Sequence, residues 1–251
     1  MPYGNAMPGR PEPALPYGNA DPRRPSTPTT GDELPFVDRR SVVPTCPPKG
    51  TPMAVIATIS SSPSTTSRTD AVLGDLAQRV QRAGHVVHPI VLRDLPAQPL
   101  LRADAEHDDI ARAACALERA DAVIVSTPVY KAAYSGLLKA FLDLLPQTGL
   151  KDKVVLPIAT GGSPAHVLAV DYALRPVLAS LAPSAITPGW FVLASEVTRL
   201  DEGEVSIADS AAGPLAEVTR VFLDAVAGSL LVAAADAAHR GELLTRSVAV
   251  A

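Results

Sequence analysis

Hydroxyl side chains and one arginine are concentrated in the segment Ser60–Arg68, which reads SSSPSTTSR. A helical pattern of apolar residues begins directly after it, at Thr69. Such a loop favours an anion, because hydroxyl groups can donate hydrogen bonds and the unpaired N–H groups and dipole of a helix N-terminus attract negative charge. The segment is therefore a candidate phosphate-binding loop. An ordinary polar loop that ends in a serine or threonine helix cap would have the same composition.

Two common phosphate-binding patterns are absent from this loop. It has neither the G-x-G-x-x-G pattern of dinucleotide-binding domains nor the G-K-S/T ending of nucleoside triphosphate loops. A single phosphate group therefore suits the loop better than a pyrophosphate.

Two later segments contain residues that suit a flat ring. Thr127–Gly136, TPVYKAAYSG, has Pro128 at the end of an apolar run and two tyrosines before the next helical pattern. Thr160–His166, TGGSPAH, places Gly161 and Gly162 at the end of another run, where the lack of a Cβ lets the backbone approach a ligand. Each segment would also serve as a plain strand-to-helix connection, so neither identifies a ligand by itself.

Apolar runs of strand length alternate with helical patterns from Met53 onwards. The expected strands are 53–59, 85–92, 122–128, 153–160 and 185–193. The expected helices are 69–82, 108–119, 136–145, 165–181 and 215–234. This alternation predicts a doubly wound α/β domain, in which a parallel sheet is covered on both faces. Ligands bind beyond the carboxyl ends of such strands, and the three segments above follow the first, third and fourth strands.

The composition limits the classes of function. The chain has 251 residues, 47% of them apolar, a net charge of −4 and a sequence pI near 5.7. This size favours one main domain, and the mild negative charge argues against nucleic acid as a partner. Cys46 and Cys115 form no C-x-x-C pair, which fits a reducing compartment and argues against a zinc site. Because no apolar run reaches about 18 residues and no secretory signal is recognisable, we expect a cytoplasmic protein without a membrane partner.

The N-terminal segment differs from the rest of the chain. Its first fifty residues hold twelve of the 25 prolines, and PYGNA occurs at 2–6 and again at 16–20. Low complexity without apolar periodicity predicts disorder, with a proline-rich docking arm as the alternative. The expected organisation is a disordered extension at 1–50, a domain at 51–234 and a C-terminal tail at 235–251.

Three motifs make the chain similar to a known family. They are TPVYKAAYSGLLKAFLDLLP at 127–146, KVVLPIATGG at 153–162 and AHVLAVDYALRPVLASL at 165–181. With them the chain resembles the NADPH-dependent FMN reductases, and among these the reductases that supply reduced flavin to alkanesulfonate monooxygenases. The resemblance covers about residues 53–191. It implies a flavodoxin-like three-layer α/β/α sandwich with a five-stranded parallel sheet of order 2-1-3-4-5.

The resemblance also implies which residues bind the cofactors. They are Ser62, Ser67, Arg68 and Thr69 at the FMN phosphate, Pro128, Val129 and Tyr130 along the isoalloxazine ring, and Thr160, Gly161 and Gly162 at its other edge. Lys131 either meets a phosphate of the nicotinamide cofactor or is simply solvated. The family loop reads G-S-P-R and then S-R-S, and here Ser61 replaces its glycine and Ser64 its first arginine, so we expect a lower flavin affinity. Tyr134 corresponds to an extra residue that produces a π-type bulge at the oligomer interface of these reductases.

These observations predict an NAD(P)H-dependent FMN reductase. Hydride passes between the two cofactors, NADPH or NADH and FMN, so no catalytic side chain and no metal are expected. The resemblance implies that a flavin-dependent monooxygenase, in sulfonate or sulfur assimilation, receives the reduced FMN. The alternatives are an enzyme with tightly bound FMN that reduces quinones, azo dyes or chromate-type oxyanions, and an electron carrier, which the mild charge disfavours. The segment 136–145 is apolar on more than one face and, with the resemblance, implies a homodimer or homotetramer.

Overall fold

The computed structural model describes residues 53–199 and 205–248 of the chain. These residues belong to the second of two units into which the chain divides, 44–251, and the account below concerns that unit. The proline-rich extension expected at 1–50 lies outside the described residues.

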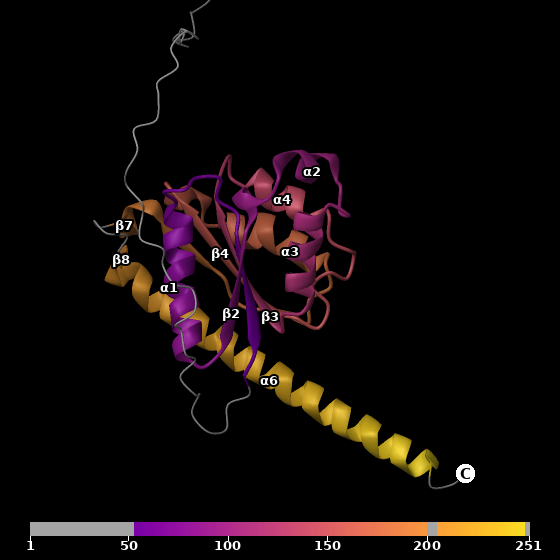
Figure 1. Ribbon diagram of the computed structural model, residues 1–251. Coiled ribbons are helices and arrows are strands. Elements are labelled where there is room, and N and C mark those ends of the chain that lie inside the picture. The colour runs from indigo at the N-terminus through magenta and orange to yellow at the C-terminus, as the bar shows by residue number, and fades with distance from the viewer. Residues whose placement is uncertain (1–52, 200–204, 249–251) are drawn as a thin grey trace, which may run out of the picture. The chain divides into compact units, whose positions relative to one another are not determined.

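A parallel sheet forms the centre of the domain (Figure 1). Its strands in spatial order are β2 (Val86–Val91), β1 (Val55–Ser60), β3 (Ala122–Pro128), β4 (Val154–Gly161) and β5 (Ala185–Ile186), and β6 (Trp190–Leu193) also pairs with β4. This order confirms the predicted arrangement 2-1-3-4-5. Every residue of β3 and β4 is buried, which explains why both strands are almost continuously apolar in sequence.

The fifth strand is interrupted, whereas a single strand was expected at 185–193. The register in which this strand pairs with β4 shifts by one residue between its first and its second piece. Pro157 of β4 lies opposite the gap and has no N–H to donate to a neighbouring strand. A Cβ on Gly189 would lie 2.5 Å from the Pro157 carbonyl oxygen, so the two backbones touch where the strand breaks into β5 and β6.

Helices cover both faces of the sheet (Figure 1). One face carries α1 (Arg68–Arg82) and α6 (Asp209–Val248), and the other carries α2 (Ala97–Arg102), α3 (Asp108–Glu118), α4 (Gly136–Leu142) and α5 (Arg175–Ala179). Alternate residues of one strand enter the two cores, since Ile56 packs with α1 and α6 and Ala57 packs with α3 and α4. The three layers confirm the predicted flavodoxin-like sandwich.

Several short elements were not predicted. They are α2, the 3₁₀ turns η1 (Leu92–Asp94) and η4 (Ala194–Glu196), and an antiparallel hairpin of β7 (Val197–Arg199) and β8 (Val205–Ile207). The helix expected at 165–181 is divided into the 3₁₀ turn η2 (Pro164–His166), the π-helix η3 (Val170–Leu174) and α5.

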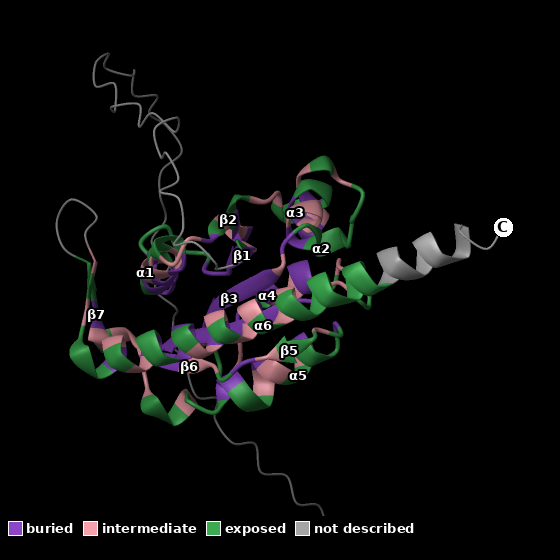
Figure 2. Ribbon diagram, turned by 90° about the horizontal axis from the view of Figure 1, so that it is seen from below, coloured by how far each residue is buried: buried purple, intermediate pink, exposed green. Residues whose placement is uncertain are grey.

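The last helix, α6, is longer than the helix expected at 215–234 and crosses the expected boundary between domain and tail without a break. Its first half packs on the sheet, where Phe222 and Val226 are buried. From Leu231 to 239 every side chain is exposed, and this part of the helix extends beyond the sheet (Figure 2).

Part of α6, residues 209–239, is long and apolar enough to cross a membrane by length and composition alone. Its most apolar stretch of 18 residues has a mean hydropathy of 1.7, and 11% of that stretch is buried. One such helix is weak evidence for a membrane span.

Candidate active site

The loops after β1, β3 and β4 surround one pocket of about 240 Å³ at the carboxyl edge of the sheet. We call it the flavin pocket after the ligand that the sequence resemblance leads us to expect there. The residues that line it are Ser62, Ser64, Thr66, Ser67, Arg68, Thr69, Pro128, Val129, Tyr130, Thr160, Gly161, Gly162 and Ala194. All the predicted cofactor-binding residues are among them except Lys131. They meet because parallel strands end at the same edge of a sheet.

The N-terminus of α1 forms one wall of the flavin pocket. Ser67 is the N-cap residue, and its Oγ accepts a hydrogen bond from the Asp70 N–H at 3.1 Å. The Ala71 N–H donates to the Ser67 carbonyl at 3.2 Å. The N–H groups of Arg68 and Thr69 precede the first intrahelical bond and are therefore available to an anion.

Hydroxyl groups hold the loop in front of this helix end. The Ser64 N–H donates to Ser62 Oγ at 3.3 Å, and the Thr66 N–H donates to Ser64 Oγ at 3.2 Å. The buried hydroxyls of Thr69 and Thr160 are hydrogen-bonded to each other, which links α1 to the end of β4. These hydrogen bonds hold the loop in one conformation.

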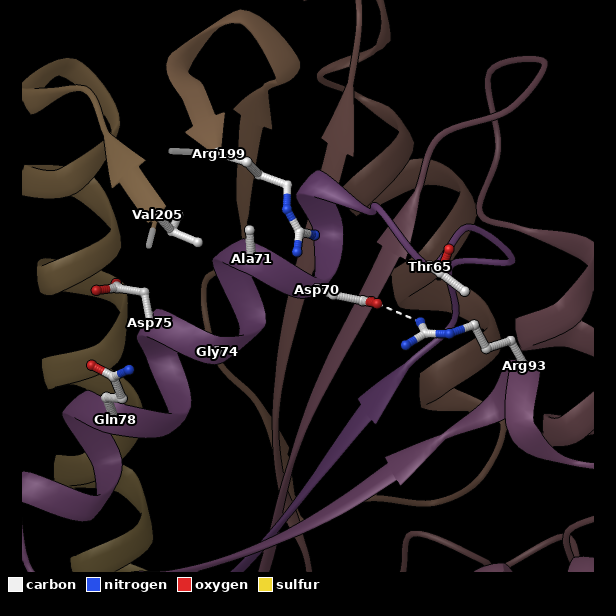
Figure 3. Close-up of a pocket in the computed structure, with 9 residues that line it drawn as sticks. All are labelled: Thr65, Asp70, Ala71, Gly74, Asp75, Gln78, Arg93, Arg199 and Val205. Carbon is white, nitrogen blue, oxygen red and sulfur yellow. Dashed lines mark hydrogen bonds and ion pairs between the residues drawn. The ribbon is translucent and has the colours of Figure 1, made fainter. Parts of the chain in front are cut away.

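The acidic residue in the first turn of α1 is paired with a cation. Asp70 forms an ion pair with Arg93 (Figure 3) and also accepts a hydrogen bond from Ser60. It lines a separate pocket of about 520 Å³ on the outer side of α1 and does not line the flavin pocket. An anion in the flavin pocket therefore meets Arg68 without facing an unpaired carboxylate of α1.

The opposite wall is built from the ends of β3 and β4. The Val129 N–H donates to the Thr160 carbonyl at 2.7 Å and joins the two loops. A Cβ on Gly161 would lie 2.7 Å from the Phe191 ring, so glycine is required there for packing. A Cβ on Gly162 would meet nothing within 4 Å, so at that position the backbone borders open space on the pocket side of the loop.

A strained turn follows Tyr130. Tyr130 and Ala133 exchange two backbone hydrogen bonds, of 2.9 and 3.1 Å, around Lys131 and Ala132. Both central residues have positive φ, 51° and 62°, a conformation that costs about 1 kcal/mol or more for residues other than glycine. The turn leaves Tyr130 half-exposed at the flavin pocket and Lys131 exposed outside its lining.

The predicted π-type bulge lies in a different segment from the one expected. Tyr134 precedes α4, whose N-cap is Ser135, and is therefore not part of a helix that could bulge. The π-helix is η3, Val170–Leu174. Pro176 follows it and cannot donate a hydrogen bond to the Tyr172 carbonyl, which favours a change of hydrogen-bond pattern in the preceding turn.

Sequence reasoning missed one part of the flavin pocket. Ala194 follows β6 and lines the pocket, although it was not among the candidates. The same rule that selected the other loops points to it, because the end of the fifth strand lies at the same edge. Among the described residues, no group of three or more His, Cys, Asp or Glu side chains is placed to hold a metal ion.

Comparisons with known proteins agree with this geometry. Residues 54–198 match the family described as NADPH-dependent FMN reductase. An FMN reductase (NADPH) of Pseudomonas putida KT2440 is 46% identical over 143 residues, 57% of this chain and 73% of that protein. The NADH-dependent FMN reductase SfnE of Pseudomonas putida is 32% identical over 151 residues, 59% of this chain and 80% of that protein.

A solved structure is also similar. The apo form of the NADH:FMN oxidoreductase EMOB aligns with a TM-score of 0.63 and 40% identity, over 69% of this chain and 90% of that one. Fold, pocket and sequence together place this chain in the NADPH-dependent FMN reductase family.

Proposed function

We propose that the chain reduces FMN with a reduced nicotinamide cofactor and binds FMN in the flavin pocket. In this proposal the FMN phosphate lies against Ser62, Ser67, Arg68 and Thr69. The isoalloxazine ring lies between the segments Pro128–Tyr130 and Thr160–Gly162, and Lys131 contacts the nicotinamide cofactor. The observation that carries the proposal is the convergence of a hydroxyl-rich helix N-terminus, an arginine and an open glycine at one pocket.

The donor set fits a phosphate monoester beside a flat ring. Arg68 supplies a positive charge. The hydroxyl groups that line the pocket and the free N–H groups of the first turn of α1 supply directional donors. FMN and the nicotinamide cofactor supply the hydride-transfer chemistry. The chain's own residues bind and orient them, and no proton transfer by a side chain is required.

We further propose that FMN is a substrate and that the reduced flavin passes to a partner monooxygenase. The flavin pocket is small and Tyr130 at its edge is 50% exposed, which fits a ligand that enters and leaves. The similarity to reductases of alkanesulfonate systems supports a role in sulfur assimilation. We propose a cytoplasmic location, in keeping with the unpaired Cys115.

A homodimer or homotetramer is also proposed. Val167, Leu168 and Tyr172 are 50%, 60% and 78% exposed, and all belong to the segment from η2 to η3. Large apolar side chains gathered on one surface are typical of a protein interface. Light scattering on the purified protein tests this, because a monomer at micromolar concentration would contradict it.

The decisive test is oxidation of NADPH and NADH by the purified protein with and without free FMN, after its visible spectrum has been recorded. A colourless protein whose turnover requires added FMN supports the proposal. A yellow protein that turns over quinones, azo dyes or chromate without free FMN supports the alternative, with FMN as a bound group.

A matched pair of variants locates the site. Arg68→Ala is expected to weaken FMN binding roughly 10- to 100-fold, because a hydrogen bond to a charged group contributes about 1.5–3 kcal/mol. Arg102→Ala, at an exposed arginine at the end of α2, serves as the control. Equal FMN affinity of the two variants would remove Arg68 from the site.

A further inference from the structure

A second pocket adjoins the flavin pocket on the side of the β7–β8 hairpin, and we call it the hairpin pocket. It has a volume of about 410 Å³ and is lined by Thr66, Arg68, Ala194, Ser195, Val197, Thr198 and Arg199. Thr66, Arg68 and Ala194 line both pockets, so ligands bound in the two pockets would lie side by side.

Two arginines are fixed at this pocket by reciprocal hydrogen bonds between α1 and β7. Arg68 Nε donates to the Val197 carbonyl at 3.2 Å, and Arg199 Nη1 donates to the Ser67 carbonyl at 3.2 Å. Figure 3 shows Arg199 reaching from β7 to the first turn of α1. A guanidinium carries five N–H donors, and these bonds use one on each side chain. Both side chains are exposed, so the other donors remain accessible.

The described residues that line this pocket include two cations and no acidic residue. Arg199 also lines the pocket on the outer side of α1, which contains Asp70 and Asp75. Arg68 and Arg199 line the same pocket, and a bound anion would attract both and so offset their mutual repulsion. Thr66, Ser195 and Thr198 add hydroxyl groups to the same surface. Guanidinium groups with neighbouring hydroxyls are the donor set that phosphate groups prefer in proteins.

We propose that the hairpin pocket binds the 2′-phosphate of NADPH and that Arg199 is the residue that determines preference for NADPH over NADH. This inference rests on the proposed function, which places the nicotinamide cofactor beside the flavin pocket. A terminal phosphate monoester carries more charge than each phosphate of the pyrophosphate bridge, and so gains more from the guanidinium of Arg199, which the FMN phosphate does not occupy in the proposed function. Arg199 lies just beyond the residues that match the family, 54–198, and the similar proteins include reductases named for either dinucleotide.

The test compares Arg199→Ala and Arg199→Gln with the wild-type protein and with Arg102→Ala as control. Glutamine keeps a donor for the Ser67 carbonyl but removes the charge, so it separates charge loss from damage to the end of α1. For both variants the KM for NADPH is expected to rise roughly 10- to 100-fold, with the KM for NADH and the affinity for FMN changed less than about twofold.

A binding measurement without turnover accompanies the kinetics. Adenosine 2′,5′-bisphosphate and 5′-AMP are titrated into each protein by calorimetry. The wild-type protein is expected to bind the bisphosphate more tightly, and Arg199→Gln to lose that difference.

Three results would overturn the proposal: equal changes in the KM for NADPH and NADH, a wild-type protein that prefers NADH, or equal binding of the two adenosine phosphates. Failure of the proposed function looks different. In that case neither dinucleotide is oxidised with FMN, while the calorimetry still decides whether the hairpin pocket selects a 2′-phosphate.

Discussion

Ser61 and Ser64 stand where the family resemblance leads us to expect a glycine and an arginine of the phosphate loop, and the structure gives the two positions different roles. Ser61 is fully buried and its Oγ donates to the Ser126 carbonyl at 2.9 Å, so its side chain is absent from the flavin pocket. Ser64 is exposed and lines the pocket, where its hydroxyl supplies no charge. We therefore attribute the expected loss of flavin affinity to the residue at position 64.

Restoring the cation at that position should strengthen binding. Ser64→Arg is expected to lower the dissociation constant for FMN about tenfold, because a charged hydrogen bond is worth about 1.5–3 kcal/mol and part of it is lost at an exposed position. Quenching of flavin fluorescence measures the affinity. Thr65→Arg is the control, since Thr65 lies outside the flavin pocket. A similar gain in both variants would mean that net charge alone is responsible.

The two glycines at the end of β4 are expected to respond differently to an added methyl group. Gly161→Ala is expected to lower the free energy of unfolding by about 1–3 kcal/mol, because the new Cβ overlaps the Phe191 ring. Gly162→Ala, with open space at its Cβ, should change it by less than about 0.5 kcal/mol. Urea unfolding of both variants without FMN tests this contrast. Two equal losses would contradict the packing role of Gly161.

At the scale of elements, the long periodic segments were predictable and the irregular ones were not. The strands at 53–59 and 122–128 and the helix at 69–82 appear within one or two residues of their expected bounds, because burial of apolar faces determines both pattern and structure. The hairpin of β7 and β8 was missed because three-residue strands show no periodicity. The segment 165–181 was expected to be one helix because a change from α to π pattern leaves its apolar spacing almost unaltered.

One half of helix α6 packs on the sheet and the other half is exposed. Substitutions in the two halves therefore test which contacts hold the helix on the domain. Phe222→Ala is expected to lower the free energy of unfolding by about 3–5 kcal/mol, because a fully buried ring leaves a cavity. Leu231→Ala, at a side chain that is 64% exposed, should cost less than about 0.5 kcal/mol. Chemical denaturation measures both, and a large loss at Leu231 would reveal a buried environment for that part of the helix.

At the scale of the whole molecule, the family resemblance implied the sheet order, and the sequence pattern identified the loops that line most of the flavin pocket. The loops meet for a topological reason, because each loop after a central parallel strand reaches the same edge. The contact between Ser67 and Arg199 could not be predicted, because it joins residues 132 positions apart through packing of an irregular segment. Where chemistry depends on such contacts, sequence pattern alone is insufficient.

Stability should fall as the pH is lowered below neutrality. Burial lowers the pKa of His85 below its ordinary value of 6.5, and its Nδ1 accepts the Ala54 N–H at 3.2 Å, which a protonated ring cannot do. The unfolded chain therefore binds more protons than the native one below about pH 6.5, and the free energy of unfolding decreases there.

A pair of histidine variants isolates this effect. His85→Asn keeps an acceptor for the Ala54 N–H but does not titrate, so its stability should depend less on pH between 7.5 and 5.5, measured by urea unfolding. His88→Asn, at an exposed position of β2, should retain the wild-type dependence. If His85→Asn also kept it, other groups would have to account for the decrease.

Trp190 in β6 is the single tryptophan of the chain, and it packs against the core shared by α1 and α6. Its Nε1 is buried without a hydrogen-bond partner among the described residues. The tryptophan fluorescence of the protein, which is excited selectively at about 295 nm, therefore comes from one position at the edge of the sheet that carries the flavin pocket. Energy transfer from this one donor to FMN gives an optical record of flavin entering and leaving, and a shift of its emission to longer wavelength records detachment of α6.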